Sequence, residues 1–283
     1  MRYCGKEFSS EQIRWITNLI ENKAGITRQD LSKRFCETFN WRKPDGGLKD
    51  MSCRVAFIKM DKDGVIKLPA PKRAYAKPGS RTGKSRRTNP KPGITKAAGQ
   101  FALRLELVRR GTSALWNEYV QRYHYLGYKA LPGAQLRYFV KAEDQPLALL
   151  GFGAAAWKTA PRDDFIGWEA GQREQNLNLV VNNARFLILP WVKSKNLASR
   201  VLSMAARQIA DDWQARYNYR PVLLETFVEK RRFAGTCYKA ANWICVGDTQ
   251  GRGKLDVHME CKVPVKSIWL YPLSRNFRKQ LAA

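Results

Sequence analysis

The sequence predicts a mixed α/β protein with a small N-terminal helical domain, a basic linker and a larger α/β domain. Residues 1–70 contain three segments in which apolar residues recur at helical spacing. Residues 71–97 are rich in Lys, Arg, Pro and Gly and contain no acidic residue, so they cannot bury a core and are expected to form a flexible linker. Residues 98–283 alternate strand-like apolar runs with helical patterns, which is typical of an α/β domain.

The charge of the chain points to a polyanionic partner. Its 283 residues include 51 Lys and Arg against 24 Asp and Glu, a formal net charge of +27. Solubility of a small domain needs a net charge of only about 2–8. The excess therefore favours nucleic acid, with DNA as the expected partner, because a strong positive field attracts a phosphate backbone.

Cysteine and histidine usage argues against a metal site. The six cysteines form no Cys-x-x-Cys pair, and there are only two histidines. We therefore expect no bound metal and no disulfide framework. No apolar run is long enough to cross a bilayer, and the first residues, MRYCGKEFSSEQ, lack the apolar region of a signal peptide. We expect a cytoplasmic protein with no membrane partner.

Two helices are predicted first in the N-terminal domain. Ser9 or Ser10, followed by Glu11 and Gln12, is a typical helix start, and Thr27 can cap the second helix. Their expected buried positions are Ile13, Ile16, Leu19 and Ile20 in the first, and Leu31, Phe35 and Phe39 in the second.

A third helix and a turn complete the expected N-terminal fold. In LKDMSCRVAFIKMDKDG we expect Met51, Val55 and Ile58 to face inward. The Asp63-Gly64 turn and a short strand after it would form a wing. Three helices and a wing predict a winged helix-turn-helix domain that contacts DNA, and the alternative is a helical cap with no DNA contact. The expected DNA-binding residues of this domain are Lys49, Arg54 and Lys62.

Basic residues outside this domain are expected to follow the phosphate backbone without reading sequence. Residues 72–96 hold nine basic residues, and the glycine-rich turn GDTQGRGK lies near the C-terminus. A solvated charge run is the alternative. The expected contacts are Lys72, Arg73, Arg81, Lys84, Arg86, Arg87, Arg252 and Lys254.

The C-terminal domain is expected to begin with a helix, TSALWNEYVQRYHYLGY. A hairpin of AQLRYFV and PLALLGFGAAAW follows, then the strand ARFLILPWV, a long helix over residues 196–213, the strand RPVLLETFV, a short helix in AGTCYKAANW, and the closing strands ICVGD and KSIWLYPL. The long helix has an apolar stripe at four-residue spacing, made of Leu197, Val201, Ala205, Ile209 and Trp213.

The short basic loop KSKNLAS leads directly into this long helix. Helix N-termini present unpaired N–H groups and the positive end of the helix dipole, so they bind phosphate. We therefore expect an anion here. The residues expected to hold it are Lys193, Lys195, Asn196, Leu197, Ala198 and Ser199.

The order of these elements resembles the GNAT family of N-acetyltransferases. In that family the loop after the fourth strand reads Arg/Gln-x-x-Gly-x-Gly/Ala and cradles the pyrophosphate of acetyl-CoA, which is the cofactor that the resemblance implies. Lys193 stands in this sequence where the family has Arg or Gln, and Asn196 stands where it has Gly. Asparagine tolerates the left-handed conformation, so the loop can form. The Gly-to-Asn departure and the excess charge nevertheless favour a DNA phosphate over acetyl-CoA.

A second local pattern, GTCYKAANW, resembles the segment in which the GNAT family places a catalytic tyrosine. The resemblance implies that Tyr238 protonates the leaving thiolate. The alternative is that Tyr238 is a core residue, which is the usual role of a tyrosine on a short helix.

Several further segments resemble the DruA-type proteins of Druantia anti-phage systems, which also occur beside bacterial insertion sequences. They include HYLGYKALPGAQLRYFV, FIGW, VVNNARFLILPWV, NLASR and LLETFV. The resemblance implies a role in phage defence or a mobile element, with defence-system or transposase partner proteins.

Two further residues are candidates for catalysis. Glu225 lies within the apolar strand LLETFVE, where a charge needs a partner, so it is either a site residue such as a general base or the partner of a basic neighbour such as Arg185. His124, between Tyr123 and Tyr125, is either an acid–base group or a packed neighbour. A metal-dependent transposase or nuclease would need clustered carboxylates. The candidates by residue type are Asp163, Asp164, Glu169, Glu225, Glu229 and Asp248.

The sequence thus predicts a DNA-binding protein of a mobile element or anti-phage system, with a GNAT-like domain used to bind nucleic acid. The alternatives are an acyl- or group-transferase that uses acetyl-CoA and acts on nucleic acid, and a metal-dependent transposase or nuclease.

Overall fold

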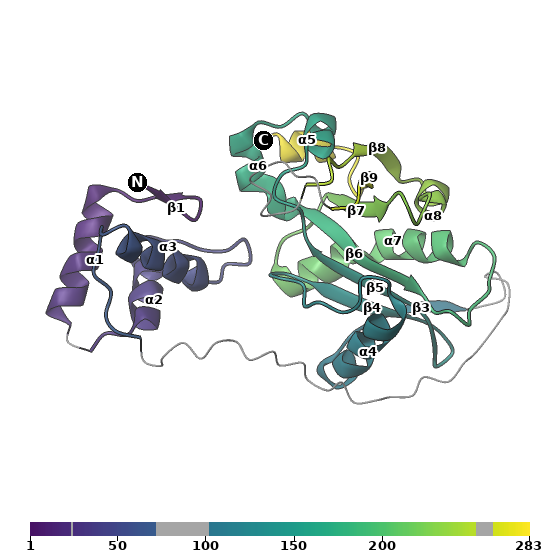
Figure 1. Cartoon of the computed structure of the whole chain (residues 1–283), viewed down its shortest axis with the longest axis horizontal. Helices are drawn as coiled ribbons and strands as arrows, with labels where there is room; N and C mark the ends of the chain where they lie inside the picture. The colour runs from purple at the N-terminus through teal and green to yellow at the C-terminus, as the bar shows by residue number, and fades with distance from the viewer. Residues whose placement is uncertain (24, 72–101, 253–262) are drawn as a thin grey trace. The chain divides into compact units, whose positions relative to one another are not determined.

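The computed structural model describes residues 1–23, 25–71, 102–252 and 263–283. The chain forms two compact units, Met1–Thr82 and Gly83–Ala283 (Figure 1). Nearly all of the expected linker, 71–97, lies outside the described residues. No helix in the described part of the chain is long and apolar enough to cross a membrane.

The N-terminal unit consists of a minimal hairpin and three helices. Its elements are β1 (Arg2–Tyr3), β2 (Lys6–Glu7), α1 (Ser10–Asn22), α2 (Arg28–Thr38) and α3 (Asp50–Lys62). Both predicted caps form. The Ser9 hydroxyl accepts from the Gln12 N–H while the Gln12 side chain accepts from the Ser9 N–H, and the Thr27 side chain accepts from the Asp30 N–H. These bonds satisfy N–H groups that the first turn of each helix leaves free.

The predicted inward face of α3 is wrong at Met51 and Val55, whereas the third predicted residue, Ile58, is partly buried and packs against the core. The buried residues of this helix are Cys53, Ala56, Phe57 and Met60, whereas Met51 is 59% exposed and Val55 is 43% exposed. The buried set follows the i, i+3, i+4, i+7 spacing of one helix face, and its small members allow α3 to pack closely on α2.

The wing strand predicted after the Asp63-Gly64 turn does not form. Gly64 does adopt a left-handed φ of +72°, but residues 65–70 have no regular structure. The Val65 N–H bonds to the Met60 carbonyl and the Leu68 N–H bonds to Asp61 Oδ1, so the end of α3 uses these donors. The connection between α2 and α3 is a loop with a bridge between Arg42 and Leu48, in place of the short turn of a helix-turn-helix.

The C-terminal unit is built on a seven-stranded sheet in the order β3-β4-β5-β6-β7-β9-β8. All neighbouring strands of this sheet are antiparallel except β6 and β7, which are parallel. The strands are β3 (Leu103–Leu107), β4 (Leu136–Ala142), β5 (Gln145–Ala154), β6 (Val180–Ile188), β7 (Leu223–Glu229), β8 (Ile244–Asp248) and β9 (Lys266–Pro272).

Helices cover both faces of this sheet (Figure 1). Consecutive residues of a strand point to opposite faces, and on β4 the Tyr138 hydroxyl bonds to Asp212 of α7 whereas Phe139 packs on Tyr119 of α4. The elements are η2 (Arg110–Thr112), α4 (Ser113–Tyr123), α5 (Ala160–Ile166), α6 (Ala170–Asn176), η3 (Leu177–Leu179), α7 (Leu197–Tyr217), α8 (Thr236–Ala240) and α9 (Phe277–Leu281). The stripe predicted on the long helix is buried as expected. Strand β3 and helices α5, α6 and α9 were not predicted.

Candidate functional site

The parallel strands β6 and β7 separate after only three paired positions. Their last pair is Asn182 with Glu225. Beyond it, the Thr226 hydroxyl donates to the Asn183 carbonyl across 3.0 Å, and Ala184 is an extra residue that bulges out of the pairing with β5. A bulge bends a strand and increases its twist. The two strands therefore diverge toward their C-terminal ends, with polar groups at the point of separation.

Tyr238 places its hydroxyl at this point of separation. The hydroxyl donates to Asn183 Oδ1 at 3.0 Å and lies 3.5 Å from the Thr226 hydroxyl. Burial raises the pKa of Tyr238 above its usual value. The phenol is therefore protonated at neutral pH and acts as a hydrogen-bond donor.

The position of Tyr238 depends on close packing around the start of α8. Its ring lies against Trp243 and Trp269, with ring-centre distances of 5.1 and 6.4 Å. Gly235 precedes the helix with a φ of +73°, and a Cβ atom at this position would lie 2.6 Å from the Trp269 ring. Only glycine fits there, so Gly235 and Trp269 together fix the short helix that carries Tyr238.

The KSKNLAS loop has the conformation of an anion site. Asn196 precedes α7 with a φ of +60°, so asparagine takes the left-handed conformation expected of it, and no side chain caps the helix. The first intrahelical bond is donated by the Arg200 N–H, which leaves the N–H groups of residues 197–199 outside the helical ladder. Lys193 and Lys195 are exposed at the same end.

One buried polar atom supports a ligand at this loop. The hydroxyl oxygen of Ser194 is buried and has no hydrogen-bond partner among the described residues. Free backbone donors, an unpaired hydroxyl and two lysines at a helix N-terminus fit the pyrophosphate of acetyl-CoA. Nothing in the loop conformation conflicts with that group, because Asn196 does adopt the backbone that glycine would supply.

His124 ends α4 as a neutral imidazole. Its Nδ1 accepts from the Leu126 N–H at 3.2 Å, and its ring stacks on Tyr125. Burial, with a smaller contribution from Arg185, lowers the pKa of His124 to about 4. With Nδ1 accepting, the proton of the neutral ring is on Nε2, so His124 acts at neutral pH as a donor and not as a base.

Glu225 is paired, but its partner is Arg162 and not Arg185. Glu225 is fully buried; its Oε1 accepts from the Ala156 N–H at 2.7 Å and its Oε2 from Arg162 at 2.8 Å. Burial raises the pKa of this carboxyl and Arg162 opposes that effect. Arg162 also bonds to Asp163, which lies 3.5 Å from Arg173. With both oxygens engaged, Glu225 ties helix α5 to strand β7.

The other candidate carboxylates do not gather around one point. Glu229 pairs with Arg232, Asp248 with Lys230, and Glu169 begins α6 through a capping box. Asp164, on α5, is exposed. Among the residues that the structure describes, no group of three or more His, Cys, Asp or Glu side chains could hold a metal ion. The described carboxylates therefore give no support to a metal-dependent nuclease.

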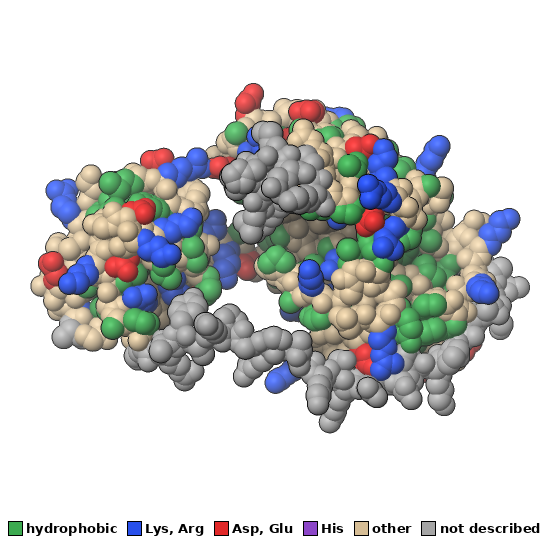
Figure 2. Space-filling model, in the orientation of Figure 1, with side chains coloured by type: hydrophobic (Ala, Val, Ile, Leu, Met, Phe, Trp, Pro, Cys, Tyr) green, Lys and Arg blue, Asp and Glu red, His purple; other side chains and the backbone are tan. Residues whose placement is uncertain are grey.

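The expected DNA-binding residues are only partly described. Lys49 precedes α3, Arg54 pairs with Asp50 at 3.1 Å, and Lys62 is exposed at the end of the helix. Arg252 is exposed beyond β8. Figure 2 shows Lys and Arg side chains spread over both units, without one dominant patch in that view. Lys72, Arg73, Arg81, Lys84, Arg86, Arg87 and Lys254 lie outside the described residues.

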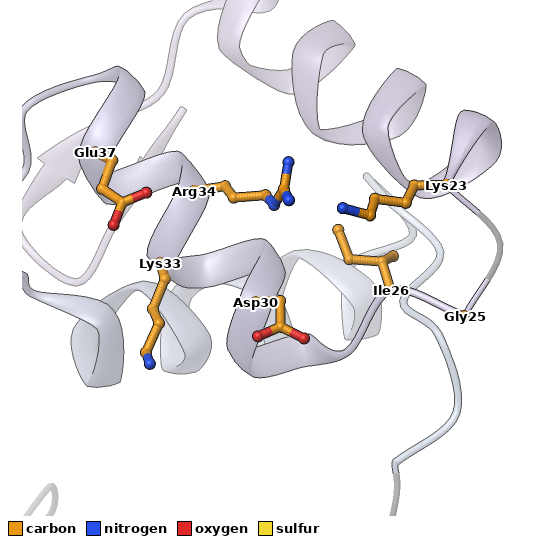
Figure 3. A pocket seen from close by; sticks show the side chains of 7 residues that line it. All are labelled: Lys23, Gly25, Ile26, Asp30, Lys33, Arg34 and Glu37. Atoms are coloured by element: carbon orange, nitrogen blue, oxygen red, sulfur yellow. The ribbon is translucent and has the colours of Figure 1, made fainter.

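A pocket of about 370 Å³ lies in the N-terminal unit, between the end of α1 and the exposed side of α2. Figure 3 shows Arg34 extending from α2 toward Lys23, whereas Lys33 points away. Asp30 and Glu37 also line it. Because the pocket mixes both signs of charge and contains none of the predicted site residues, it does not extend the site of the C-terminal unit.

Several residues at the site were not predicted from the sequence, namely Asn183, Thr226 and Arg162. The pair Asn182-Asn183 within the apolar run VVNNARFLIL was the available signal, because buried amides in a strand need specific partners. Arg162 had no such signal, since its partner Glu225 is 63 residues away.

Several solved structures resemble this chain at low sequence identity. A search of curated proteins found no match. Among solved structures, similarity extends to the ribosomal-protein-S18-alanine N-acetyltransferase from Escherichia coli (8% identity, 61% of this chain and 94% of that chain, TM-score 0.38) and to the aminoglycoside acetyltransferase AAC(6')-Ib in complex with coenzyme A (14%, 63% and 98%, 0.40). An acetyltransferase of the GNAT family from Streptococcus pneumoniae is also similar (10%, 61% and 99%, 0.39). The C-terminal unit is a mixed α/β fold built on a seven-stranded mixed sheet.

The model of one protein family, described as Druantia protein DruA, matches residues 59–260. The match spans the end of α3, the basic segment and the C-terminal unit through β8, and it includes the diverging strands and the loop before α7. This chain belongs to the DruA family.

Proposed function

We propose that the C-terminal unit is a group transferase that binds an acetyl-CoA-type cofactor and acts on nucleic acid. The observation that carries this proposal is the left-handed Asn196 at the uncapped N-terminus of α7. The sequence favoured a DNA phosphate at this loop because Asn replaces Gly and because the chain carries an excess of positive charge. The observed φ of +60° removes the first of these objections.

Each part of the proposed site has a definite task. The N–H groups of residues 197–199, with Lys193 and Lys195, would hold the pyrophosphate. Helix-end interactions contribute only about 0.3–1 kcal/mol each at exposed sites, so the lysines and the strand gap must contribute the rest. The cofactor, when bound, supplies a thioester whose acyl group is transferred. Tyr238, which burial keeps protonated, would donate its proton to the departing sulfur.

The charge of the chain supports nucleic acid as the acceptor. A net charge of +27 is unfavourable for a compact protein unless a polyanion balances it. Membership of a family named for Druantia supports a role in anti-phage defence, together with other proteins of such a system.

Calorimetric titration of the full chain with acetyl-CoA tests the proposal. We expect saturable binding that the double variant Lys193→Glu, Lys195→Glu weakens at least 10-fold. The matched control is Lys158→Glu, Lys279→Glu, which makes the same charge change at two exposed lysines elsewhere. Absence of binding in the wild type, or equal weakening in both double variants, would contradict a cofactor site at this loop.

The charge also favours a second candidate function, in which the same loop binds a DNA phosphate and transfers no group. Affinity for duplex DNA should then fall steeply with salt, since each neutralised phosphate releases about 0.9 counterion. The double variant Lys193→Glu, Lys195→Glu distinguishes the candidates. The second function would replace the first if two results were obtained together. The wild type would show no acetyl-CoA binding, and this double variant would lose more DNA affinity than the charge-matched control does.

A further inference from the structure

Two exposed aromatic rings and three polar donors gather beside the diverging strands. The turn after α4 contributes His124 and Tyr125, strand β6 contributes Arg185, and the loop after β7 contributes Arg232 and Phe233. We refer to these five residues as the aromatic–arginine cluster. The chain brings them together from three separate elements.

The rings of Tyr125 and Phe233 contact each other and remain partly exposed. Their centres lie 5.4 Å apart, and the residues are 39% and 50% exposed. Arg232 lies over the Tyr125 ring at 5.2 Å, and His124 stacks on that ring at 4.9 Å. Large aromatic rings that remain exposed next to cations are the side chains on which unpaired bases stack.

Arg185 supplies a positive charge with no balancing carboxylate. It donates to the Ala184 carbonyl at 2.7 Å, its Nε is buried without a hydrogen-bond partner, and no carboxylate of the described residues forms an ion pair with it. Burial lowers the pKa of this guanidinium. A half-buried arginine that lacks a counter-ion is unfavourable, and an anionic ligand would remove that cost.

The remaining charged groups leave the cluster positive. Glu229 acts electrostatically on Tyr125, and Arg232 already binds this carboxylate at 3.1 Å. His124 is neutral at pH 7 and presents its Nε2 proton as a donor, because Leu126 occupies Nδ1. The cluster also adjoins the proposed catalytic residue, since Arg185 lies two residues beyond Asn183 on β6 and Tyr125 acts electrostatically on Tyr238.

We propose that the aromatic–arginine cluster binds an unpaired nucleotide of single-stranded nucleic acid, with Arg185 on a backbone phosphate and a base stacked on Tyr125 and Phe233. The proposal rests on the proposed function in taking nucleic acid as the acceptor. It places the acceptor beside Tyr238 and assigns the α7 loop to the cofactor alone. A duplex presents an unpaired base only at the cost of unstacking and unpairing it, so the cluster favours single strands.

Fluorescence anisotropy with a labelled 15-nucleotide oligo(dT) and the full chain tests this assignment. We expect the double variant Tyr125→Ala, Phe233→Ala to lose roughly 10-fold or more in affinity for oligo(dT), because stacking on an aromatic ring contributes substantially for each base. The same variant should bind a 15-base-pair duplex as the wild type does. Arg185→Gln should weaken oligo(dT) binding and reduce its salt dependence by about 0.7 in the log–log slope, the value for one single-strand phosphate.

Two control variants separate this site from general charge and exposed aromatic surface. Trp157→Ala removes another exposed ring with an arginine over it, at 5.9 Å from Arg173, and should leave the affinity unchanged. Arg104→Gln is the control for Arg185→Gln, because it also removes one positive charge, from a surface pair with Asp144. Near-ultraviolet circular dichroism of each variant shows whether it is folded. If the double alanine variant is unfolded, Tyr125→Leu and Phe233→Leu are used in its place, because leucine keeps more of the packing.

The outcomes distinguish this proposal from the cofactor site. Any of three results would overturn it. The folded ring variants could bind oligo(dT) as the wild type does, they could lose as much affinity for the duplex as for oligo(dT), or Trp157→Ala could lose as much affinity for oligo(dT) as they do. Calorimetry with acetyl-CoA on the same ring variants should match the wild type. If the ring variants lost affinity for acetyl-CoA, the rings would instead bind the adenine of the cofactor, and the assignment to the acceptor would be overturned. If the wild type did not bind acetyl-CoA at all, that result would contradict the proposed function and would leave the nucleotide site standing.

Discussion

The Tyr238 hydroxyl bonds to the Asn183 side chain at 3.0 Å where strands β6 and β7 part. The tyrosine comes from helix α8 and the asparagine from β6, 55 residues earlier in the sequence. The bond holds a protonated phenol at the gap between the strands, and the Thr226 hydroxyl lies 3.5 Å from it. The phenol hydroxyl thus contacts both strands, β6 and β7.

Tyr238→Phe should abolish proton donation without disturbing the α7 loop. We expect the release of free CoA thiol, measured with acetyl-CoA and a mixed-sequence single-stranded oligonucleotide whose bases carry amino groups, to slow roughly 100-fold or more, which is the usual contribution of a positioned acid. Acetyl-CoA affinity should not change. Tyr217→Phe is the control, because that hydroxyl makes equivalent bonds to the Gln135 backbone at 2.8 and 2.9 Å. Equal rates in wild type and Tyr238→Phe would show that Tyr238 is only a core residue.

Glu225→Gln should destabilise the protein because it removes one partner of a buried ion pair. Arg162 is fully buried and would lose the carboxylate at 2.8 Å but keep Asp163 at 2.7 Å, so we expect a cost of about 1–3 kcal/mol in the free energy of unfolding. Urea denaturation measures it. Asp144→Asn, which breaks the exposed pair with Arg104, is the control and should have little effect. An unchanged unfolding midpoint with lost transfer activity would point to a catalytic carboxylate instead.

Substitutions at Asn196 should separate backbone conformation from side-chain chemistry. Asn196→Gly should keep both stability and acetyl-CoA affinity, because the site needs only the left-handed backbone at φ +60°. Asn196→Val should cost about 1–2 kcal/mol of stability and weaken acetyl-CoA binding. Asn218 ends the same helix at φ +59°, so Asn218→Val should cost similar stability and leave the affinity intact. Tight binding by Asn196→Val would mean that the loop does not hold the pyrophosphate.

His124 should make stability fall as the solution becomes acidic. Its pKa is about 4 in the folded protein and near 6.5 when unfolded, so below pH 6.5 the unfolded state binds the extra proton. The stability it contributes is complete above pH 6.5 and is lost as the pH falls through 4. Allowing for partial exposure, we expect a loss of roughly 1–2 kcal/mol relative to His124→Phe, which cannot titrate. Urea denaturation of both proteins at several pH values between 7.5 and 4.5 measures this loss. If the free energy of unfolding fell equally with pH in the wild type and in His124→Phe, the imidazole would not be the cause.

Local patterns in the sequence were sufficient to predict the mixed α/β class of the fold and the loop that leads into the long helix. Caps at Ser9 and Thr27, the stripe of the long helix and the left-handed Asn196 are local features, which short-range hydrogen bonds and helical spacing decide. The family resemblance likewise depended on local motifs, and the DruA match over residues 59–260 confirms it.

Features that depend on contacts between residues far apart in the sequence could be identified only in the folded structure. The inward face of α3 is set by packing against α2, and the end of that helix takes the backbone donors that a wing strand would need. Glu225 was recognisable as a buried charge, but only the folded chain brings Arg162 to it in place of Arg185. The same holds for Tyr125 and Phe233, whose rings come from different elements and lie 5.4 Å apart. Spacing along the chain reports contacts within an element, whereas contacts between elements depend on the packing of the whole sheet.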